Sequence, residues 1–239
     1  MKLKSIPIYG SLYPEPPYIY HGTRLILVLF QVDKNKLVDV IPEGLKLPSG
    51  KNTTVMAFFA DYVKSSIGQY YEAATLIDVK CESKTLGKVR GFYCNSMFVD
   101  SDTAMAAGRE IWGFPKKLAK IQLIEKGNQV IGTLERRNIE IMKMTLDLEN
   151  DIAELPMPDI PIITFRQFFA PGGGDYSLKQ FQKIPMELEP DKIKSGNLKL
   201  EFKHSEEDPL SVFESGSESV VTAVYIKLKR GVLPWGKLL

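Results

Sequence analysis

The chain has 239 residues, which is long enough for a sizeable core and is a common length for a single all-β domain. Hydrophobic residues make up 44% of the chain and charged residues 25%, as in ordinary globular proteins. The net charge of +2 argues against a general nucleic-acid-binding protein, and no apolar run approaches the roughly 20 residues that span a membrane.

The chain begins with a segment rich in proline and tyrosine, residues 1–20, which predicts an extended N-terminal arm. Residues 24–32 predict a buried strand, after which Asp33 caps a short helix that stops at Pro42. Strand-like runs follow, many of which alternate apolar and polar residues as half-buried antiparallel strands do. They lie at residues 53–63, 69–82, 89–100, 119–127, 129–138, 139–149, 160–169, 176–189, 196–204 and 219–233.

One segment breaks this pattern. Residues 101–113 carry alanines that favour a helix, with Ser101 or Asp102 as the cap and Gly113 as the end. No linker or repeat divides the rest, so residues 21–239 predict a single domain of mainly β (α+β) class. A few short helices and one closed or strongly curved antiparallel sheet fit this pattern.

The chain has two cysteines, Cys81 and Cys94, and its two histidines are far from any metal-binding spacing. Both cysteines lie in strand-like runs, which favours buried free thiols in a reducing compartment. A zinc site is not indicated. The N-terminal residues lack the apolar region of a signal peptide, so we expect a soluble, cytoplasmic protein that does not bind membranes.

The stretch "AGREIWGFPKKLAKI", residues 107–121, places Lys116 and Lys117 side by side among apolar residues. A free lysine has a pKa of about 10.4, so a nucleophilic lysine needs an environment that favours the neutral amine. Repulsion from a neighbouring ammonium and desolvation by apolar walls both act in this direction. Adjacent side chains of an extended segment point to opposite faces, and the sequence leaves open which effect dominates.

This stretch resembles the signature of the acetoacetate decarboxylase family, in which G-R-E is followed by four variable residues and then P-K-K-L. The matching positions are Gly108, Arg109, Glu110, Phe114, Pro115, Lys116, Lys117 and Leu118. The segments "IGQYYEAA", "YCNSMFVDSDTAMAAGRE" and "VIGTLERRNIEI" add to the resemblance, which extends from about residue 20 to 150.

The resemblance implies a cone-like β-barrel, a homo-oligomer and a small keto acid as substrate. It implies that Lys116 forms a Schiff base with the substrate and that Lys117 modulates it. A lysine activated by desolvation or by another cation is the known pattern of acetoacetate decarboxylase. Glu72 takes the place of a catalytic glutamate, and Arg24 is placed to bind the substrate carboxylate. This chemistry needs no metal or organic cofactor.

The sequence departs from the family at a second glutamate, expected fifteen residues before Glu72, where Ala57 stands. The nearest carboxylate, Asp61, is about 13 Å further along an extended strand. This leaves three functions open. One is a β-keto acid decarboxylase, one is a relative that uses the same lysine for aldolase or dehydratase chemistry, and one is a non-catalytic binding barrel.

Overall fold

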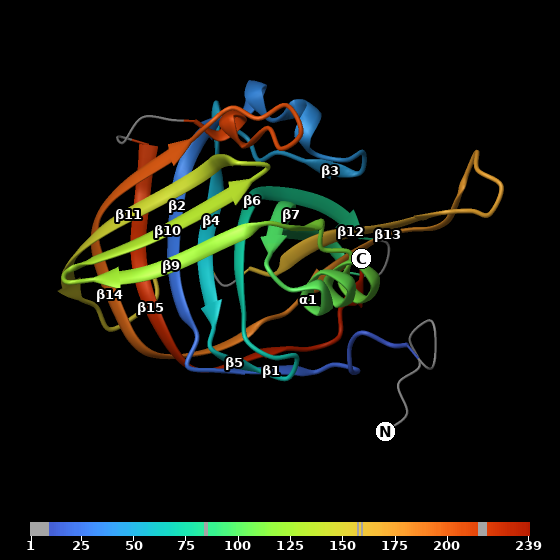
Figure 1. Ribbon diagram of the computed structural model, residues 1–239. Coiled ribbons are helices and arrows are strands. Elements are labelled where there is room, and N and C mark those ends of the chain that lie inside the picture. Colours follow the sequence, from blue (N-terminus) through green and yellow to red (C-terminus); the bar gives the residue numbers. More distant parts are fainter. Residues whose placement is uncertain (1–9, 84–85, 157, 159, 215–218) are drawn as a thin grey trace.

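The computed structural model of the protein describes residues 10–83, 86–156, 158, 160–214 and 219–239 (Figure 1). Within these ranges the chain is mainly β, as predicted. The strands are β1 (Tyr18–His21), β2 (Arg24–Asp33), β3 (Leu45–Lys46), β4 (Asn52–Tyr62), β5 (Lys64–Ser65), β6 (Tyr70–Ser83), β7 (Gly87–Val99), β8 (Lys116–Leu118), β9 (Lys120–Lys126), β10 (Gln129–Arg136), β11 (Ile139–Asp151), β12 (Ile162–Phe169), β13 (Tyr176–Ile184), β14 (Glu187–Phe202), β15 (Val220–Leu233) and β16 (Lys237–Leu238). The helical segments are η1 (Lys34–Lys36), η2 (Val38–Val40), α1 (Asp102–Ala107), η3 (Gly108–Trp112) and η4 (Leu210–Phe213).

These strands form one sheet, in which twelve follow the order β16-β13-β12-β7-β6-β4-β2-β15-β14-β11-β10-β9. The short strands β1, β3 and β8 pair with β15, β6 and β7, and β5 pairs with β1. Its two end strands, β16 and β9, are not paired with each other in the described part of the chain, so the closed barrel that we expected is not observed. The sheet is also mixed, because β7 runs parallel to both β8 and β12.

The sheet curls instead of closing, and β9, β10 and β11 lie across β4 and β6 (Figure 1). These two layers are held together by close packing of side chains and not by strand pairing. Gly132 on β10 lies against Phe59 on β4, and a Cβ added to this glycine would lie 2.4 Å from the Phe59 ring. The apolar side chains between the two layers form one of the two hydrophobic clusters of the fold.

The two faces of β4 serve different parts of the molecule, because successive side chains of a strand alternate between faces. Ala57 and Phe59 point into the cluster between the layers. Phe58, Ala60 and Tyr62 point to the opposite face, where a second cluster and a cavity lie.

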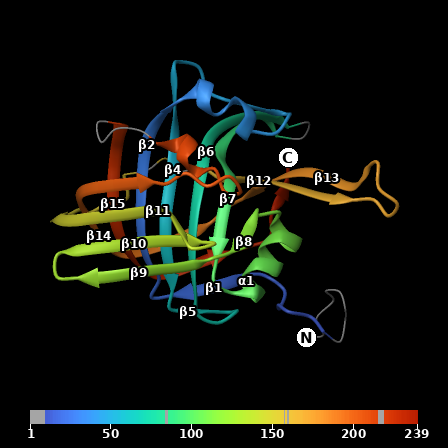
Figure 2. The same ribbon diagram turned by 45° about the horizontal axis from the view of Figure 1, so that its top comes forward.

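The predicted helix at residues 101–113 forms α1 and the π-helical turn η3 that continues it. The Ser101 hydroxyl caps the helix by accepting from the backbone N–H of Ala104 at 3.3 Å. Gly113 ends the segment with a φ of 71°, in the left-handed region that suits glycine. Figure 2 shows α1 beside β8, the strand that follows η3 and was not among the predicted strands.

Two other predicted features appear in modified form. The helix expected after Asp33 is divided into the 3₁₀ turns η1 and η2, with the Asp33 carboxylate capping the first. The arm predicted at residues 1–20 lies partly outside the described residues, and its last part belongs to β1, which pairs with β15. Tyr13 also donates a hydrogen bond to Glu110, which binds this part of the arm to η3.

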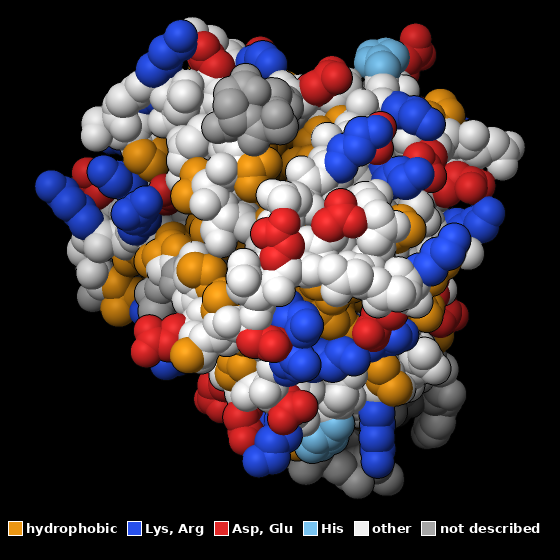
Figure 3. Space-filling view, turned by 90° about the vertical axis from the view of Figure 1, so that its left-hand side faces the viewer, with side chains coloured by type: hydrophobic (Ala, Val, Ile, Leu, Met, Phe, Trp, Pro, Cys, Tyr) orange, Lys and Arg blue, Asp and Glu red, His pale blue; other side chains and the backbone are white. Residues whose placement is uncertain are grey.

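Strands β12 and β13 form a projecting hairpin whose tip carries residues 170–175 (Figures 1 and 2). On the face shown in Figure 3, positive and negative side chains are interspersed.

Among the described residues, no helix has the length and apolar character needed to cross a membrane. Cys81 and Cys94 are both buried free thiols, as predicted.

Candidate active site

A cavity of about 570 Å³ lies on the face of the sheet that carries α1. Its walls come mainly from apolar side chains of β2, β4 and β15 and from the segments that flank β12 and β13. Cavities of this size are typical of small-molecule binding sites in proteins. The polar side chains on its wall include Lys116 and Glu72, which makes it the candidate active site.

Lys116 and Glu72 form a buried ion pair at this wall. The Lys116 Nζ lies 2.7 Å from Glu72 Oε2, and the two residues are only 5% and 4% exposed. The ammonium also lies 5.5 Å from the centre of the Tyr70 ring and 5.7 Å from that of Phe114. The lysine head group is therefore almost completely removed from water, with one carboxylate and two aromatic faces around it.

Three tyrosines extend this polar group. The Tyr62 hydroxyl donates to Glu72 Oε1 at 3.0 Å, and the Tyr70 hydroxyl donates to that of Tyr20 at 3.3 Å. Burial is the main cause that raises the pKa of Tyr62 and of Tyr70 well above the usual value of a phenol. Both hydroxyls therefore stay protonated at neutral pH and act as hydrogen-bond donors inside the cavity.

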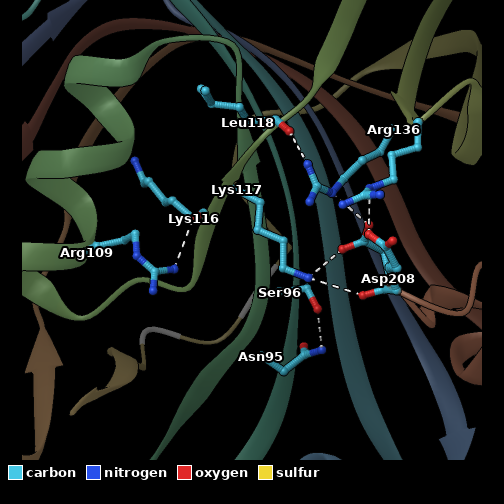
Figure 4. A network of polar contacts seen from close by, with 10 residues as sticks. Asn95, Ser96, Arg109, Lys116, Lys117, Leu118, Arg136 and Asp208 are labelled. Atoms are coloured by element: carbon cyan, nitrogen blue, oxygen red, sulfur yellow. Dashed lines mark hydrogen bonds and ion pairs between the residues drawn. The ribbon is translucent and has the colours of Figure 1, made fainter. Parts of the chain in front are cut away.

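The stem of Lys116 is positioned by the turn of helix before it. Gly108 lies directly against this stem, and a Cβ added there would lie 2.5 Å from Lys116 Cδ and 2.6 Å from Cε. Arg109 donates from Nη1 to the backbone carbonyl of Lys116 at 3.1 Å (Figure 4). The G-R-E part of the motif thus provides the space for the lysine and holds its backbone.

With Lys116 as the expected Schiff-base residue, Gly108→Ala should lower kcat by about 100-fold, because a displacement of the reacting group by about 1 Å has this effect. Its stability should change little, since alanine favours a helix over glycine by about 1 kcal/mol. A matched control is Gly132→Ala, which meets the Phe59 ring in the other cluster at a similar distance. The control should lower the melting temperature with little loss of kcat per folded molecule. Equal kcat values for the two variants would contradict this role of Gly108.

Lys117 leaves β8 in the direction opposite to Lys116 (Figure 4). Its ammonium lies 2.5 Å from Asp208 Oδ1, and Arg136 Nε lies 2.7 Å from Oδ2 of the same buried carboxylate. Arg136 also donates to the carbonyl of Leu118 at 2.6 Å. Lys117 is absent from the cavity wall and belongs to a network that holds β8 in place.

Comparison with known proteins identifies the family of the chain. The profile described as "Acetoacetate decarboxylase (ADC)" matches residues 5–232. The chain belongs to the acetoacetate decarboxylase family. This membership confirms the resemblance that was based on the "GREIWGFPKKL" motif.

Curated members of the acetoacetate decarboxylase family align with part of the chain. "Acetoacetate decarboxylase 1" of Mesorhizobium japonicum is 30% identical over 156 residues, which cover 64% of this chain and 60% of that protein. "Acetoacetate decarboxylase" of Ralstonia nicotianae is 28% identical over 151 residues, which cover 63% and 58%. The aligned region thus spans less than two thirds of each relative.

Solved structures share the fold over nearly the whole chain. The acetoacetate decarboxylase of Legionella pneumophila superposes with a TM-score of 0.82 at 24% identity, covering 96% of this chain and 90% of that one. The enduracididine biosynthesis enzyme MppR, in complex with pyruvate, has a TM-score of 0.80 at 16% identity, with 98% and 96% coverage. The fold of the acetoacetate decarboxylase family therefore includes the C-terminal third, where the sequence resemblance was weak.

One expectation from the acetoacetate decarboxylase resemblance does not fit the cavity. Arg24, predicted to bind the substrate carboxylate, forms ion pairs with buried Asp61 and with Glu125, the latter at 3.1 Å, and does not line the cavity. It extends from the face of β2 opposite to Leu25, which does line the cavity. Ala57 likewise lies on the far face of β4, so neither it nor Asp61 replaces a second glutamate.

Other polar residues of the cavity were not predicted. Tyr70 precedes Glu72 by two positions on β6, so strand alternation alone could have placed it on the same face. Tyr62 pairs with Tyr70 across the β4–β6 ladder, a register that depends on the connecting turn. Lys183 and Lys237 also line the cavity and are paired in register, but they come from β13 and β16, beyond the matched motif.

Proposed function

We propose that this protein is a decarboxylase of β-keto acids such as acetoacetate and that it acts through a Schiff base on Lys116. The observation that carries the proposal is the buried Lys116–Glu72 pair, 2.7 Å apart, at the wall of a largely apolar cavity. The curated relatives named acetoacetate decarboxylase support the same reaction class.

The first half of the proposed reaction forms the imine. Glu72 accepts a proton from the Lys116 ammonium, and the neutral Nζ attacks the ketone carbon of the substrate. A C–N bond forms, and the carbonyl oxygen leaves as water with two protons, one from the attacking nitrogen and one that Glu72 returns. This leaves a protonated imine on Lys116 and an ionised Glu72. Tyr62 keeps the Glu72 carboxylate in place through its hydrogen bond at 3.0 Å.

The second half breaks the carbon–carbon bond. The bond to the carboxylate carbon breaks, its electron pair moves into the protonated imine, and carbon dioxide leaves an enamine on Lys116. The enamine carbon then takes a proton from the Glu72 carboxyl group, which lies beside Lys116 and takes up this proton from water. Water hydrolyses the resulting imine and releases the ketone and the free lysine. The apolar walls favour the loss of carbon dioxide, because they keep water away from the substrate carboxylate, whose charge disappears in that step.

The second candidate function is imine chemistry without decarboxylation, such as an aldol condensation or dehydration of another keto acid. One observation favours it: among the described residues, Glu72 is the one carboxylate that lines the cavity. The relative MppR, described in complex with pyruvate, shares the fold with this chain. The third possibility is a non-catalytic binding protein, which has no need for a reactive lysine.

Borohydride reduction with acetoacetate or with pyruvate, followed by intact and peptide mass measurement, tests the proposal. We expect an isopropyl-sized adduct on Lys116 from acetoacetate, which requires both imine formation and loss of carbon dioxide. Adducts that retain the carboxyl group would support the second candidate. The absence of any adduct from the folded protein would contradict both enzymatic functions and favour a binding protein.

A further inference from the structure

The floor of the cavity runs across four neighbouring strands. Glu72 on β6 pairs in register with Ala60 on β4, which pairs with Leu25 on β2, which pairs with Ile226 on β15. Directly paired residues point to the same face of a sheet, and all four of these line the cavity. Since neighbouring strands lie about 4.8 Å apart, this row extends about 14 Å from Glu72 to Ile226.

The composition changes along this floor. Lys116, Glu72 and Tyr70 lie at the end on β6 and β8, and the rings of Tyr62 and Tyr20 extend this group. The other charged residues of the cavity, Lys183 and Lys237, come from β13 and β16, which are not among the four strands of the floor. Beyond the small side chain of Ala60, the row continues with leucine and isoleucine. The other walls are also largely apolar, with cavity-lining residues that include Leu155, Ile160, Ile184 and Met186.

Acetoacetate is much smaller than this space. Its four carbons are joined by three bonds of about 1.5 Å, so the carbon chain is shorter than about 5 Å. It would occupy the polar end and leave the apolar floor beyond Ala60 in contact with water, an arrangement that is unfavourable in proportion to the exposed apolar area.

We propose that the preferred substrates are β-keto acids with an extended apolar chain, whose tail lies on the floor from Ala60 to Ile226 while the ketone reaches Lys116. This inference rests on the proposed function. Since burial of one methylene improves binding by up to about fourfold, such acids gain transition-state binding that acetoacetate lacks.

The test is a chain-length series of 3-oxo acids, from acetoacetate through 3-oxohexanoate and 3-oxooctanoate to 3-oxododecanoate, with the uncatalysed rate subtracted. We expect kcat/KM to rise at least tenfold from acetoacetate to 3-oxooctanoate. The value of kcat/KM should level off or fall once the alkyl tail is longer than the apolar floor of the cavity. A flat or falling series from acetoacetate onward would overturn the inference.

A substitution at the far end of the floor tests where the alkyl tail of the substrate lies. Ile226→Phe places a larger side chain at the far end of the floor and should lower the ratio of kcat/KM for 3-oxododecanoate to that for acetoacetate about tenfold. The matched control is Val221→Phe on the same strand, where the side chain is 61% exposed and outside the cavity. The control should keep the wild-type ratio, and the same fall in both variants would contradict the proposed location.

The outcomes separate this inference from the function on which it rests. Turnover of acetoacetate without a gain for longer acids would overturn the inference alone. Turnover of the longer acids with little activity on acetoacetate would support both. The absence of turnover and of a Lys116 adduct with every acid would overturn the proposed function and this inference together.

Discussion

Replacing Lys116 with methionine is expected to abolish the borohydride-trapped adduct and to lower kcat by at least about 10⁴-fold, the scale seen when a covalent nucleophile is removed. Methionine keeps an unbranched stem of similar length, so it can fill the space beside Gly108 without the amine. Adduct formation is measured by peptide mass and kcat by release of carbon dioxide, on protein whose fold is checked by circular dichroism.

Lys117→Met is the matched control, because each substitution removes one ammonium from a buried carboxylate. Asp208 keeps Arg136 as a partner in this variant, at 2.7 Å. Since the Lys117 ammonium lies on the other side of β8, we expect the Lys116 adduct to persist and kcat to stay within about tenfold of wild type. Loss of the adduct in Lys117→Met would instead support the modulating role that the family resemblance implies.

The position of the lysine proposed to react could be predicted from sequence because the motif is local. Gly108, Arg109 and Lys116 lie within nine consecutive residues, and the capping pattern at Ser101 already indicates a helix before them. The direction of each lysine could not be predicted in this way. It depends on β8, a strand of three residues that is defined only by its pairing with β7.

Whether each remaining predicted residue lines the cavity depends on the face of the strand from which its side chain extends. Glu72 was assigned by resemblance and does lie at the cavity beside Lys116. Arg24 was assigned in the same way but extends to the opposite face of β2, where buried Asp61 binds it. A shift of one residue changes the face of a strand, so a motif matched without its register does not determine a binding role.

The strand patterns could not show that the sheet curls without closing, because alternation indicates one buried face and says nothing about which edges meet. The packing of Gly132 against Phe59 is the contact that allows β10 to cross β4. These residues are separated by more than seventy positions, and the glycine gives no local signal beyond the absence of a side chain in a strand.

The electrostatics of the site depend on Glu72, whose carboxylate has Lys116 on one oxygen and the Tyr62 hydroxyl on the other. Glu72→Gln keeps the volume and an acceptor for Tyr62 but leaves the Lys116 ammonium buried without its counter-charge. Breaking a buried ion pair from one side costs about 3–5 kcal/mol, and neither residue is exposed enough for water to offset this. We expect the free energy of unfolding to fall by about 3 kcal/mol, or roughly 6–12 °C in melting temperature.

Catalysis should fall as well, because the variant lacks the carboxyl group that the proposed mechanism uses to take a proton from Lys116 and, later, to protonate the enamine. A loss in kcat of about 10²–10⁴-fold is the usual range for a general acid–base group. The double variant Lys116→Met/Glu72→Gln removes both charges, so it should be more stable than the sum of the single losses predicts, by about 2 kcal/mol. If the losses in free energy of unfolding were strictly additive in chemical unfolding, the coupling would be contradicted. A wild-type kcat in Glu72→Gln would remove Glu72 from the mechanism. Lys116 would then exchange protons with water or with the substrate.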